Sequence, residues 1–267
     1  MVKIFTIVKD EADIVRDWVI YHGCMFGWNN IFVIDNYSTD GTWEILNDFS
    51  TLIKLYREPD YKQKGVYMTN LINQHCNNEI AFPIDIDEFI VYYDNNQISI
   101  DKELLNNYFN NLPIVRVYKA NYINPYITDP NGYQRSTIEA SHGSYFDMGD
   151  IAKSFVHTMH FKTQIDHGNH IMCNDYHLTK ICLVHYHFRN LEQMKKKIIN
   201  NVTGLGYDFN LDYLRNLINT RPNCDGNHHV RSAIQVLENT YIFPTRPIDE
   251  HAIDLNVLKN RIADGFF

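Results

Sequence analysis

The chain has 267 residues, 45% of them hydrophobic, and a formal net charge of −8. This composition supports a complete hydrophobic core and excludes a disordered protein, and the length suits one large α/β domain or a domain with a small appendage. The negative charge argues against a general nucleic-acid-binding surface, so we expect no nucleic-acid partner. It still permits a local basic pocket that binds phosphate groups.

Apolar runs and cysteines bear on the cellular compartment. Charges at Lys9, Asp10 and Glu11 interrupt the N-terminal apolar run too early for the hydrophobic core of a signal peptide. No window approaches the roughly 18 apolar residues of a membrane span, so we expect no transmembrane segment. The five cysteines are scattered and include no CxxC pair, which is typical of reduced thiols. We therefore expect a cytoplasmic protein, in the host cytoplasm if the protein is viral.

Strands alternate with helices in the first third of the chain. Segments rich in β-branched residues predict strands at 3–8, 31–34, 52–56 and 80–84, and helical apolar spacing predicts helices at 13–22, 42–49 and 65–76. Such alternation is typical of βαβ units and a mostly parallel sheet. The expected fold class is therefore α/β, with a Rossmann-like central sheet flanked by helices.

The rest of the chain changes character at residue 190. Up to that point we expect a helix at 102–109, a strand at 114–119, a pocket-shaping loop at 121–141 and a strand at 181–184. Helical spacing returns at 191–202, 211–217, 229–239 and 255–262. The predicted domains are therefore residues 1–189 and a helical C-terminal appendage at 190–267, which is a candidate surface for homo-oligomer formation. Apolar residues of this appendage, such as Leu214 and Ile234, are expected to pack rather than to bind a ligand.

An acidic stretch interrupts the apolar residues around the fourth expected strand. Asp85, Asp87 and Glu88 lie between Ile84 and Phe89. An unpaired carboxylate inside a buried strand is unfavourable, so we expect the strand to end at Ile84 and both aspartates to project from its carboxyl end, where open α/β sheets bind ligands. Two carboxylates separated by one residue form an oxygen site for Mg²⁺ or Mn²⁺. A polar turn between two strands is the alternative.

Polar residues collect at two further strand ends. Lys9-Asp10-Glu11 follows the first expected strand, and residues 35–41 follow the second. The carboxyl ends of parallel strands lie along one edge of a sheet, so these groups and Asp85 are expected to form one constellation. We expect Asp40 to cap the helix that follows, and Asp35, which ends its strand, to contact a ligand.

With these residues in view, the chain resembles nucleotide-sugar-dependent glycosyltransferases of the GT-A fold, and among them the family-2-like group. The resemblance rests on four motifs in the expected order: Ile7-Val8-Lys9-Asp10-Glu11, Ile34-Asp35-Asn36-Tyr37-Ser38-Thr39-Asp40-Gly41-Thr42, Asp85-Ile86-Asp87-Glu88-Phe89 and, more weakly, Leu183-Val184-His185-Tyr186-His187. The third motif looks like the DXD metal motif of the family. The first three lie within residues 1–95, and the resemblance does not extend to the helical tail.

The resemblance implies a site for a nucleotide-sugar donor, with UDP as the commonest nucleotide, and for a Mn²⁺ or Mg²⁺ ion that stabilises the departing diphosphate. The implied metal ligands are Asp87, Asp85 (directly or through the water shell of the metal) and His185. Imidazole suits Mn²⁺ better than Mg²⁺. The implied donor contacts are Val8, Lys9 and Glu11 at the base, Asp35 at the base or ribose, Asp85 at the ribose, and Lys153 and Arg189 at the diphosphate.

An inverting transfer also needs a general base that deprotonates the acceptor hydroxyl. The candidates lie downstream of the metal motif: Asp166 first, then Asp150, Asp147 and His170. The family pattern usually shows an acidic pair here, and this chain has no clear Glu-Asp pair, which leaves the stereochemistry open. The expected acceptor is a hydroxyl of a glycan or of another molecule.

Two other functions fit part of the pattern. A sugar-phosphate nucleotidyltransferase also uses an α/β sheet and a metal ion, but usually carries a glycine-rich loop after the first strand, where this chain has Lys9-Asp10-Glu11. A catalytically inert glycan-binding module is the non-enzyme alternative, and the intact Asp85 and Asp87 argue against it. The leading prediction is metal-dependent glycosyl transfer from a nucleoside-diphosphate sugar, by an inverting reaction with a carboxylate base.

Overall fold

The computed structural model describes residues 1–133, 138–159, 165–166, 169–171, 175–246 and 248–264. The chain divides into two compact units. The first, which we call the sheet unit, comprises Met1–Tyr126, Ile138–His187 and Ile248–Phe267. The second, the helical unit, comprises Ile127–Thr137 and Phe188–Pro247.

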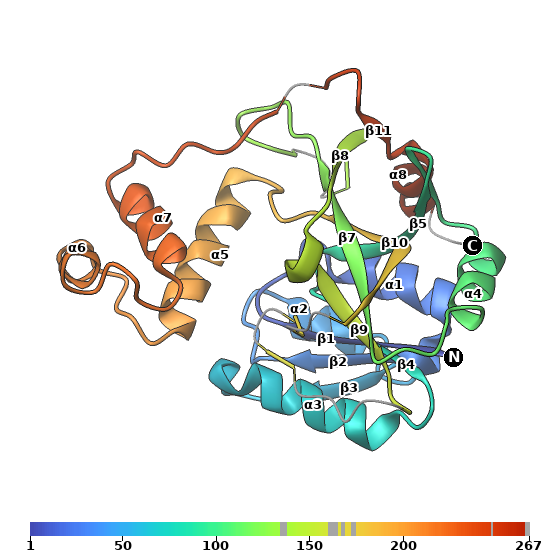
Figure 1. The fold of residues 1–267 in the computed structure, drawn as a ribbon. Helices are drawn as coiled ribbons and strands as arrows, with labels where there is room; N and C mark the ends of the chain where they lie inside the picture. Colours follow the sequence, from blue (N-terminus) through green and yellow to red (C-terminus); the bar gives the residue numbers. More distant parts are fainter. Residues whose placement is uncertain (134–137, 160–164, 167–168, 172–174, 247, 265–267) are drawn as a thin grey trace. The chain divides into compact units, whose positions relative to one another are not determined.

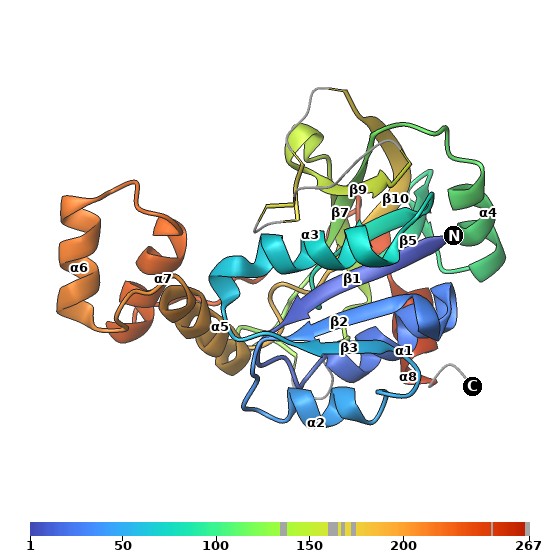
Figure 2. The ribbon, with the colours of Figure 1, turned by 90° about the horizontal axis from the view of Figure 1, so that it is seen from below.

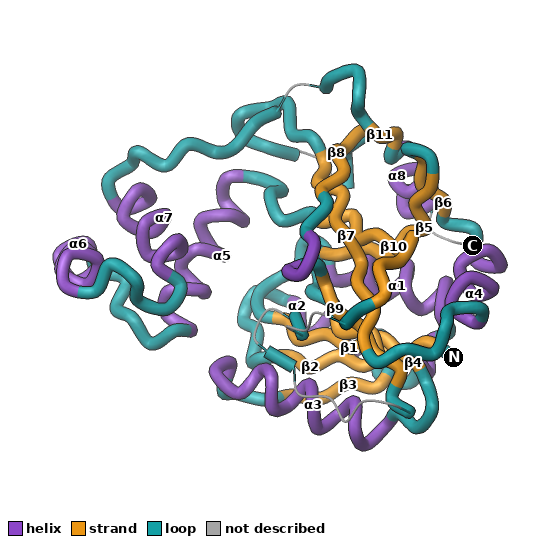
Figure 3. The backbone as a smooth tube through the Cα atoms, viewed as in Figure 1, coloured by secondary structure: helices purple, strands orange, loops and turns teal. Residues whose placement is uncertain are grey.

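The strands of the described residues join one 11-stranded sheet, whose main path runs β3-β2-β1-β4-β9-β7-β10-β5-β6 (Figures 1 and 3). They are β1 (Val2–Val8), β2 (Ile31–Asp35), β3 (Lys54–Arg57), β4 (Ile80–Pro83), β5 (Glu88–Asp94), β6 (Gln97–Ser99), β7 (Val117–Pro125), β8 (His142–Phe146), β9 (Lys153–His157), β10 (His177–His185) and β11 (Ile253–Asp254). Strand β8 pairs with β7, and β11 pairs with β8.

Strand direction divides the sheet into two parts. Strands β3, β2, β1 and β4 run parallel to one another, as the alternation of strands and helices predicts. Beyond β4 the pairing is mixed: β9 runs antiparallel to both β4 and β7, whereas β10 runs parallel to β7 and antiparallel to β5. The expected α/β class, with a central sheet flanked by helices, is confirmed.

Helices cover both faces of the parallel part. The helices of the sheet unit are α1 (Val15–Phe26), α2 (Thr42–Asn47), α3 (Lys64–His75), α4 (Lys102–Asn110) and α8 (Asn256–Ala263). Figure 2 shows α3 on one side of β1–β3 and α2 on the other. Phe5 and Ile7 of β1 pack with Met68 of α3. Because both faces are covered, β1 is a nearly continuous apolar run, as expected for a buried parallel strand.

Helix α1 is fixed to β5 by two buried side chains. The indole Nε1 of Trp18 donates to the carbonyl oxygen of Glu88 at 2.9 Å, and the hydroxyl of Tyr21 donates to that of Ile90 at 2.6 Å. Both side chains are fully buried. These bonds hold the start of β5, and therefore the acidic stretch before it, against a rigid helix.

The helical unit contains α5 (Leu191–Gly204), α6 (Leu211–Thr220) and α7 (Asn227–Leu237). The side chains of Asn190 and Asn210 cap α5 and α6 by accepting hydrogen bonds from the backbone N–H groups of Gln193 and Tyr213. The expected packing role of the apolar residues is confirmed, since Leu214 is fully buried in the core of this unit.

Two sequence expectations differ from the structure. The expected loop at 121–141 was wrong at its start, because β7 continues to Pro125. The last residues, 248–267, belong to the sheet unit, where β11 pairs with β8, although the predicted appendage included them. A polar, interrupted sequence hides both features: β7 is rich in Tyr and Asn, and β11 has two residues.

Two features of the described residues concern membrane-spanning helices and disulfide bonds. Within them, no helix has both the length and the apolar character needed to cross a membrane. Cys24, Cys76, Cys182 and Cys224 are free thiols, and Cys173 lies outside the described residues.

Buried His22 makes folding sensitive to acid. Its Nδ1 lies 2.9 Å from the carbonyl oxygen of Trp18, and the N–H of Ile90 points at its Nε2 at 3.4 Å, an arrangement that suits the neutral ring. Burial lowers the pKa of His22 to about 3, although its hydrogen bond to Trp18 opposes the shift. In the unfolded chain the imidazole binds a proton as the pH falls below about 6.5, whereas in the folded chain the buried ring stays neutral. The free energy of unfolding therefore falls as the pH drops from there toward 3.

We predict that the free energy of unfolding falls by roughly 2 kcal/mol more in the natural protein than in His22→Phe between pH 7.5 and pH 5. Urea unfolding at both pH values measures the difference. His251→Gln is the matched control, the same loss of an imidazole at a side chain that is 86% exposed. Equal pH dependence in the natural protein and His22→Phe contradicts a neutral buried ring.

Candidate metal centre and nucleotide-binding edge

Strand ends from distant parts of the sequence meet at one edge of the sheet. Strands β1, β2 and β4 are parallel, so Val8, Asp35 and Pro83 end at the same edge. Strand β9 is antiparallel to both β4 and β7, so β7 runs in the same direction as β4. Strand β10 is parallel to β7 and therefore also runs in that direction. His185, the last residue of β10, therefore lies at the edge where β4 ends.

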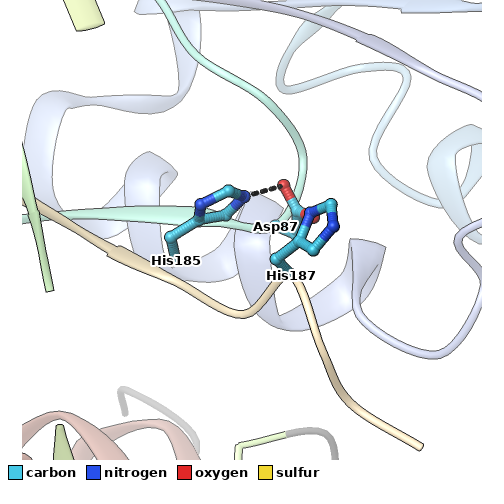
Figure 4. A group of neighbouring side chains, drawn as sticks. All are labelled: Asp87, His185 and His187. Atoms are coloured by element: carbon cyan, nitrogen blue, oxygen red, sulfur yellow. Dashed lines mark ion pairs between the residues drawn. The ribbon is translucent and has the colours of Figure 1, made fainter. Parts of the chain in front are cut away.

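Asp87, His185 and His187 form a cluster that could hold a metal ion (Figure 4). One ligand atom from each residue lies within 4.8 Å of the others. The His185 Nε2 lies 3.6 Å from Asp87 Oδ1, and the two imidazole centroids are 5.2 Å apart. Asp87 is 2% exposed, whereas both histidines are partly exposed, so the cluster opens to solvent on the histidine side.

The register between β5 and β10 creates this cluster. Glu88 is paired with His185, which places the preceding residue, Asp87, beside the end of β10. The N–H of Tyr186 donates to the carbonyl oxygen of Asp87 at 2.8 Å and fixes the two segments. Residues two apart on an extended chain point to the same side, so His185 and His187 both reach Asp87.

The donor set fits a divalent transition metal. One carboxylate oxygen and two imidazole nitrogens suit Mn²⁺ better than Mg²⁺, which prefers oxygen ligands. His185, which the resemblance implies as a ligand, is part of the cluster, and its role stays a prediction. Asp85, the other implied ligand, is not part of the cluster.

Asp85 is engaged by side chains from three other segments. Its Oδ1 accepts hydrogen bonds from Lys64 Nζ at 2.9 Å and Asn169 Nδ2 at 3.0 Å, and its Oδ2 accepts one from Lys153 Nζ at 2.8 Å. Burial alone raises the pKa of Asp85, but Lys153 and Lys64 outweigh this effect and hold the pKa below its usual value. The carboxylate is therefore ionised.

Glu88 completes a buried ionic network. Its Oε1 lies 3.0 Å from Lys153 Nζ, and its Oε2 accepts the backbone N–H of Asp85 at 2.8 Å. Burial raises the pKa of Glu88, and the nearby Lys153 only partly reverses the shift. The pKa of Lys153 is raised well above its ordinary value, because Asp85 and Glu88 outweigh the opposing effect of burial. The resemblance implies Lys153 as a diphosphate contact. Its side chain is 1% exposed and already forms ion pairs with Asp85 and Glu88.

Asp35 lies at the other end of the edge. It is fully buried, and its carboxylate accepts the N–H of Ser38 at 3.2 Å and Arg57 Nε at 3.0 Å. The Arg57 guanidinium lies 4.4 Å from the ring centroids of both Tyr37 and Trp43. Asp35 therefore organises a cationic and aromatic group next to the end of β2.

The loop after β1 is bound to the loop after β2. Lys9 Nζ donates to the carbonyl oxygen of Tyr37 at 2.5 Å, and the N–H of Glu11 donates to Thr42 Oγ1 at 2.8 Å. Asp40 Oδ1 accepts the N–H of Thr42 at 3.0 Å, but the N-cap residue of α2 is Gly41, so Asp40 is not the cap that the sequence predicted. Val8 is buried and is paired with Asp35.

The candidate bases have different surroundings. Asp166 is exposed, and its Oδ1 accepts the N–H of His170 at 2.7 Å. The N–H of Asn169 donates to the carbonyl oxygen of Asp166 at 3.2 Å, which links this turn to Asp85 through the Asn169 side chain. Burial, and then Lys153, lower the pKa of His170, which favours a neutral ring.

The two remaining candidates lie near the 3₁₀ turn Gly149–Ile151. Asp150 is exposed, and its carbonyl oxygen accepts Lys119 Nζ at 2.7 Å. Asp147 Oδ1 accepts the N–H of Gly149 at 3.0 Å. Arg189, implied as a diphosphate contact, belongs to the helical unit, and its role stays a prediction.

Sequence reasoning assigned no role to several residues of this edge. They are Lys64, Asn169, His187 and Arg57. For His187 a signal was present, because His185-Tyr186-His187 repeats the spacing of Asp85-Ile86-Asp87. The contacts of the other three residues with this edge follow from the tertiary structure and from no local sequence pattern.

No protein-family model matches the sequence, and comparison with curated proteins finds no match. Among solved structures, the chain is similar to glucosyl-3-phosphoglycerate synthase from Mycobacterium tuberculosis, in complex with Mg²⁺ and uridine diphosphate, at 10% identity and a TM-score of 0.33, over 46% of this chain and 43% of that one. Mannosyl-3-phosphoglycerate synthase from Rubrobacter xylanophilus gives 19% identity and a TM-score of 0.31, over 51% and 43%.

A cytidylyltransferase from Leptospira borgpetersenii serovar Hardjo-bovis gives 11% identity and a TM-score of 0.31, over 45% of this chain and 53% of that one. The chain thus matches less than two thirds of the length of each of these solved chains.

We predict that Lys153→Met lowers the free energy of unfolding by about 3–5 kcal/mol, because it leaves the Glu88 carboxylate, which is 1% exposed, without its cation. Urea unfolding at pH 7.5 measures the loss. Lys180→Met is the control: Lys180 pairs with Asp94 at 2.7 Å, but both side chains are well exposed, so the loss should stay below about 1 kcal/mol. Equal losses in the two variants contradict a stabilising buried network.

Proposed function

We propose that the protein is a metal-dependent glycosyltransferase that moves a sugar from a nucleoside-diphosphate donor to a hydroxyl acceptor. The observation that carries this proposal is the cluster of Asp87, His185 and His187 at the carboxyl edge of the sheet, the edge where Asp35 ends β2. Open α/β sheets bind ligands at this edge. The cluster therefore lies where a bound nucleotide can reach a metal ion.

The proposed donor site divides between the two ends of this edge. Asp87, His185 and His187 would hold Mn²⁺ or Mg²⁺, and the ion supplies charge stabilisation for the departing diphosphate. The nucleoside would lie near Asp35, with Val8, Lys9 and Glu11 as neighbours. We propose UDP as the nucleotide, because it is the commonest one in the family that the chain resembles.

The proposed reaction inverts the sugar, and Asp166 accepts the proton of the acceptor hydroxyl. Asp166 is exposed, as a base that meets an incoming acceptor must be, and its turn is linked to Asp85 through Asn169. Asp150 and His170 are the alternative bases. The acceptor that we propose is a glycan or another hydroxyl compound.

We predict that the protein releases a nucleoside diphosphate from a UDP-sugar in a Mn²⁺-dependent manner, and that Asp87→Asn lowers this rate at least about 10²-fold. Coupled detection of the nucleoside diphosphate over a panel of donors measures the rate. Asp94→Asn, an exposed change outside the edge, should keep the rate within about twofold.

The product distinguishes the alternatives. Release of pyrophosphate instead would assign the protein to the nucleotidyltransferases. Metal-independent glycan binding, with no turnover of any donor, would leave only the binding module.

We predict that Asp166→Asn lowers the transfer rate at least about 10²-fold while donor affinity is retained, because only proton removal is lost. Isothermal titration with the donor and a steady-state assay separate the two quantities. Asp150→Asn serves as the comparison. Near-normal turnover of Asp166→Asn removes Asp166 from the role, and a large loss in Asp150→Asn alone transfers it to Asp150.

A further inference from the structure

The two aspartates of the Asp85-Ile86-Asp87 motif have different surroundings. Asp87 lies beside two imidazoles, with His185 Nε2 at 3.6 Å. Asp85 is surrounded by donors: two ammonium groups and one amide lie within 3.0 Å of its oxygens. The motif therefore presents one carboxylate to metal-binding groups and the other to cations.

The contacts of Asp85 work against metal ligation. A carboxylate oxygen accepts about two hydrogen bonds in its plane. Oδ1 already has two donors, Lys64 and Asn169, and Oδ2 has Lys153. A divalent cation on Asp85 would also lie close to two ammonium groups, which repel it.

The groups around Asp85 are themselves held in place. Lys153 is 1% exposed and also faces Glu88, and the side chain of Lys64 is 4% exposed at the first turn of α3. Asn169 is fully buried and has a positive φ of 58°, a conformation that asparagine tolerates better than most residues. Asp85 is thus the common partner of three side chains from three segments.

We infer that Asp85 is a positioning residue and not a metal ligand: its carboxylate fixes Lys64, Lys153 and Asn169 beside the metal centre formed by Asp87, His185 and His187. Only the catalytic part of this inference rests on the proposed function. The division of roles within the motif concerns metal binding and is independent of it.

Asn169 is the group through which this positioning can act on a substrate. Its Nδ2 is committed to Asp85. Its Oδ1 is buried and has no hydrogen-bond partner in the part of the chain that the structure describes. An unpaired buried acceptor is unfavourable, so this oxygen is suited to receive a hydrogen bond from a hydroxyl of a bound sugar nucleotide. Asp85 keeps the amide in that orientation.

The test is a calorimetric titration with Mn²⁺ alone, without nucleotide. Asp85→Asn should keep the dissociation constant of the natural protein within about threefold, as for a change that contacts none of the ligands. Asp87→Asn is the matched variant, an identical change two residues away, and should weaken binding more than about 10-fold. Equal weakening in the two variants overturns the inference, as does a natural protein that binds no Mn²⁺.

A second variant guards against loss of folding. If Asp85→Asn does not fold, the double variant Asp85→Asn with Lys64→Met removes one charge of each sign from the network and takes its place in the titration. Retained Mn²⁺ affinity in the double variant supports the inference, and lost affinity with intact circular dichroism contradicts it.

Kinetics then separates this inference from the proposed function. In the Mn²⁺-dependent donor assay, Asp85→Asn should lower kcat at least about 10-fold, the scale expected when a group that orients another is lost, while half-activation occurs at an unchanged Mn²⁺ concentration. If no nucleotide sugar is turned over by the natural protein, the proposed function fails, and the Mn²⁺ titration still decides the role of Asp85.

Discussion

The geometry of the site depends on one lysine ammonium that lies between two carboxylates. Lys153 begins β9, Asp85 follows β4, and Glu88 begins β5, so one buried cation ties three strands together within 3.0 Å. A buried charge is tolerated only when its partners remain in place. The backbone between Asp85 and Glu88 is therefore set, and with it the direction of Asp87. The cluster of Asp87, His185 and His187 is a consequence of this ionic contact and of the register that pairs Glu88 with His185.

The arrangement separates two tasks that a pair of nearby acids could otherwise share. Lys64, Lys153 and Asn169 surround Asp85, while two imidazoles surround Asp87. Electrostatics makes the first group a poor place for a divalent cation and the second a good one. The parallel strands then bring Asp35 and its Arg57 partner to the same edge. In the proposed function, one end of this edge holds the metal ion and the other end holds the nucleoside.

Much of this edge follows from the sequence, because strand ends can be found without pairing the strands. Apolar runs that stop at polar residues predicted Asp35, Asp85 and Asp87 as edge residues, and the resemblance implied His185. The partners could not be found in this way. Lys64 and Asn169 meet at Asp85 only through tertiary packing, and the closeness of β10 to Asp87 depends on two antiparallel steps that no local pattern encodes. The C-terminal strand β11 was missed because two residues carry no periodicity.

The central claim is that the metal ion binds through Asp87, His185 and His187. Anomalous diffraction at the manganese edge, from crystals soaked in Mn²⁺, tests it most directly. The account predicts a peak in coordination contact with those three side chains, with the Asp85 carboxylate still bonded to Lys64 and Lys153. A peak on the Asp85 carboxylate, or one elsewhere with the three side chains unligated, would contradict it.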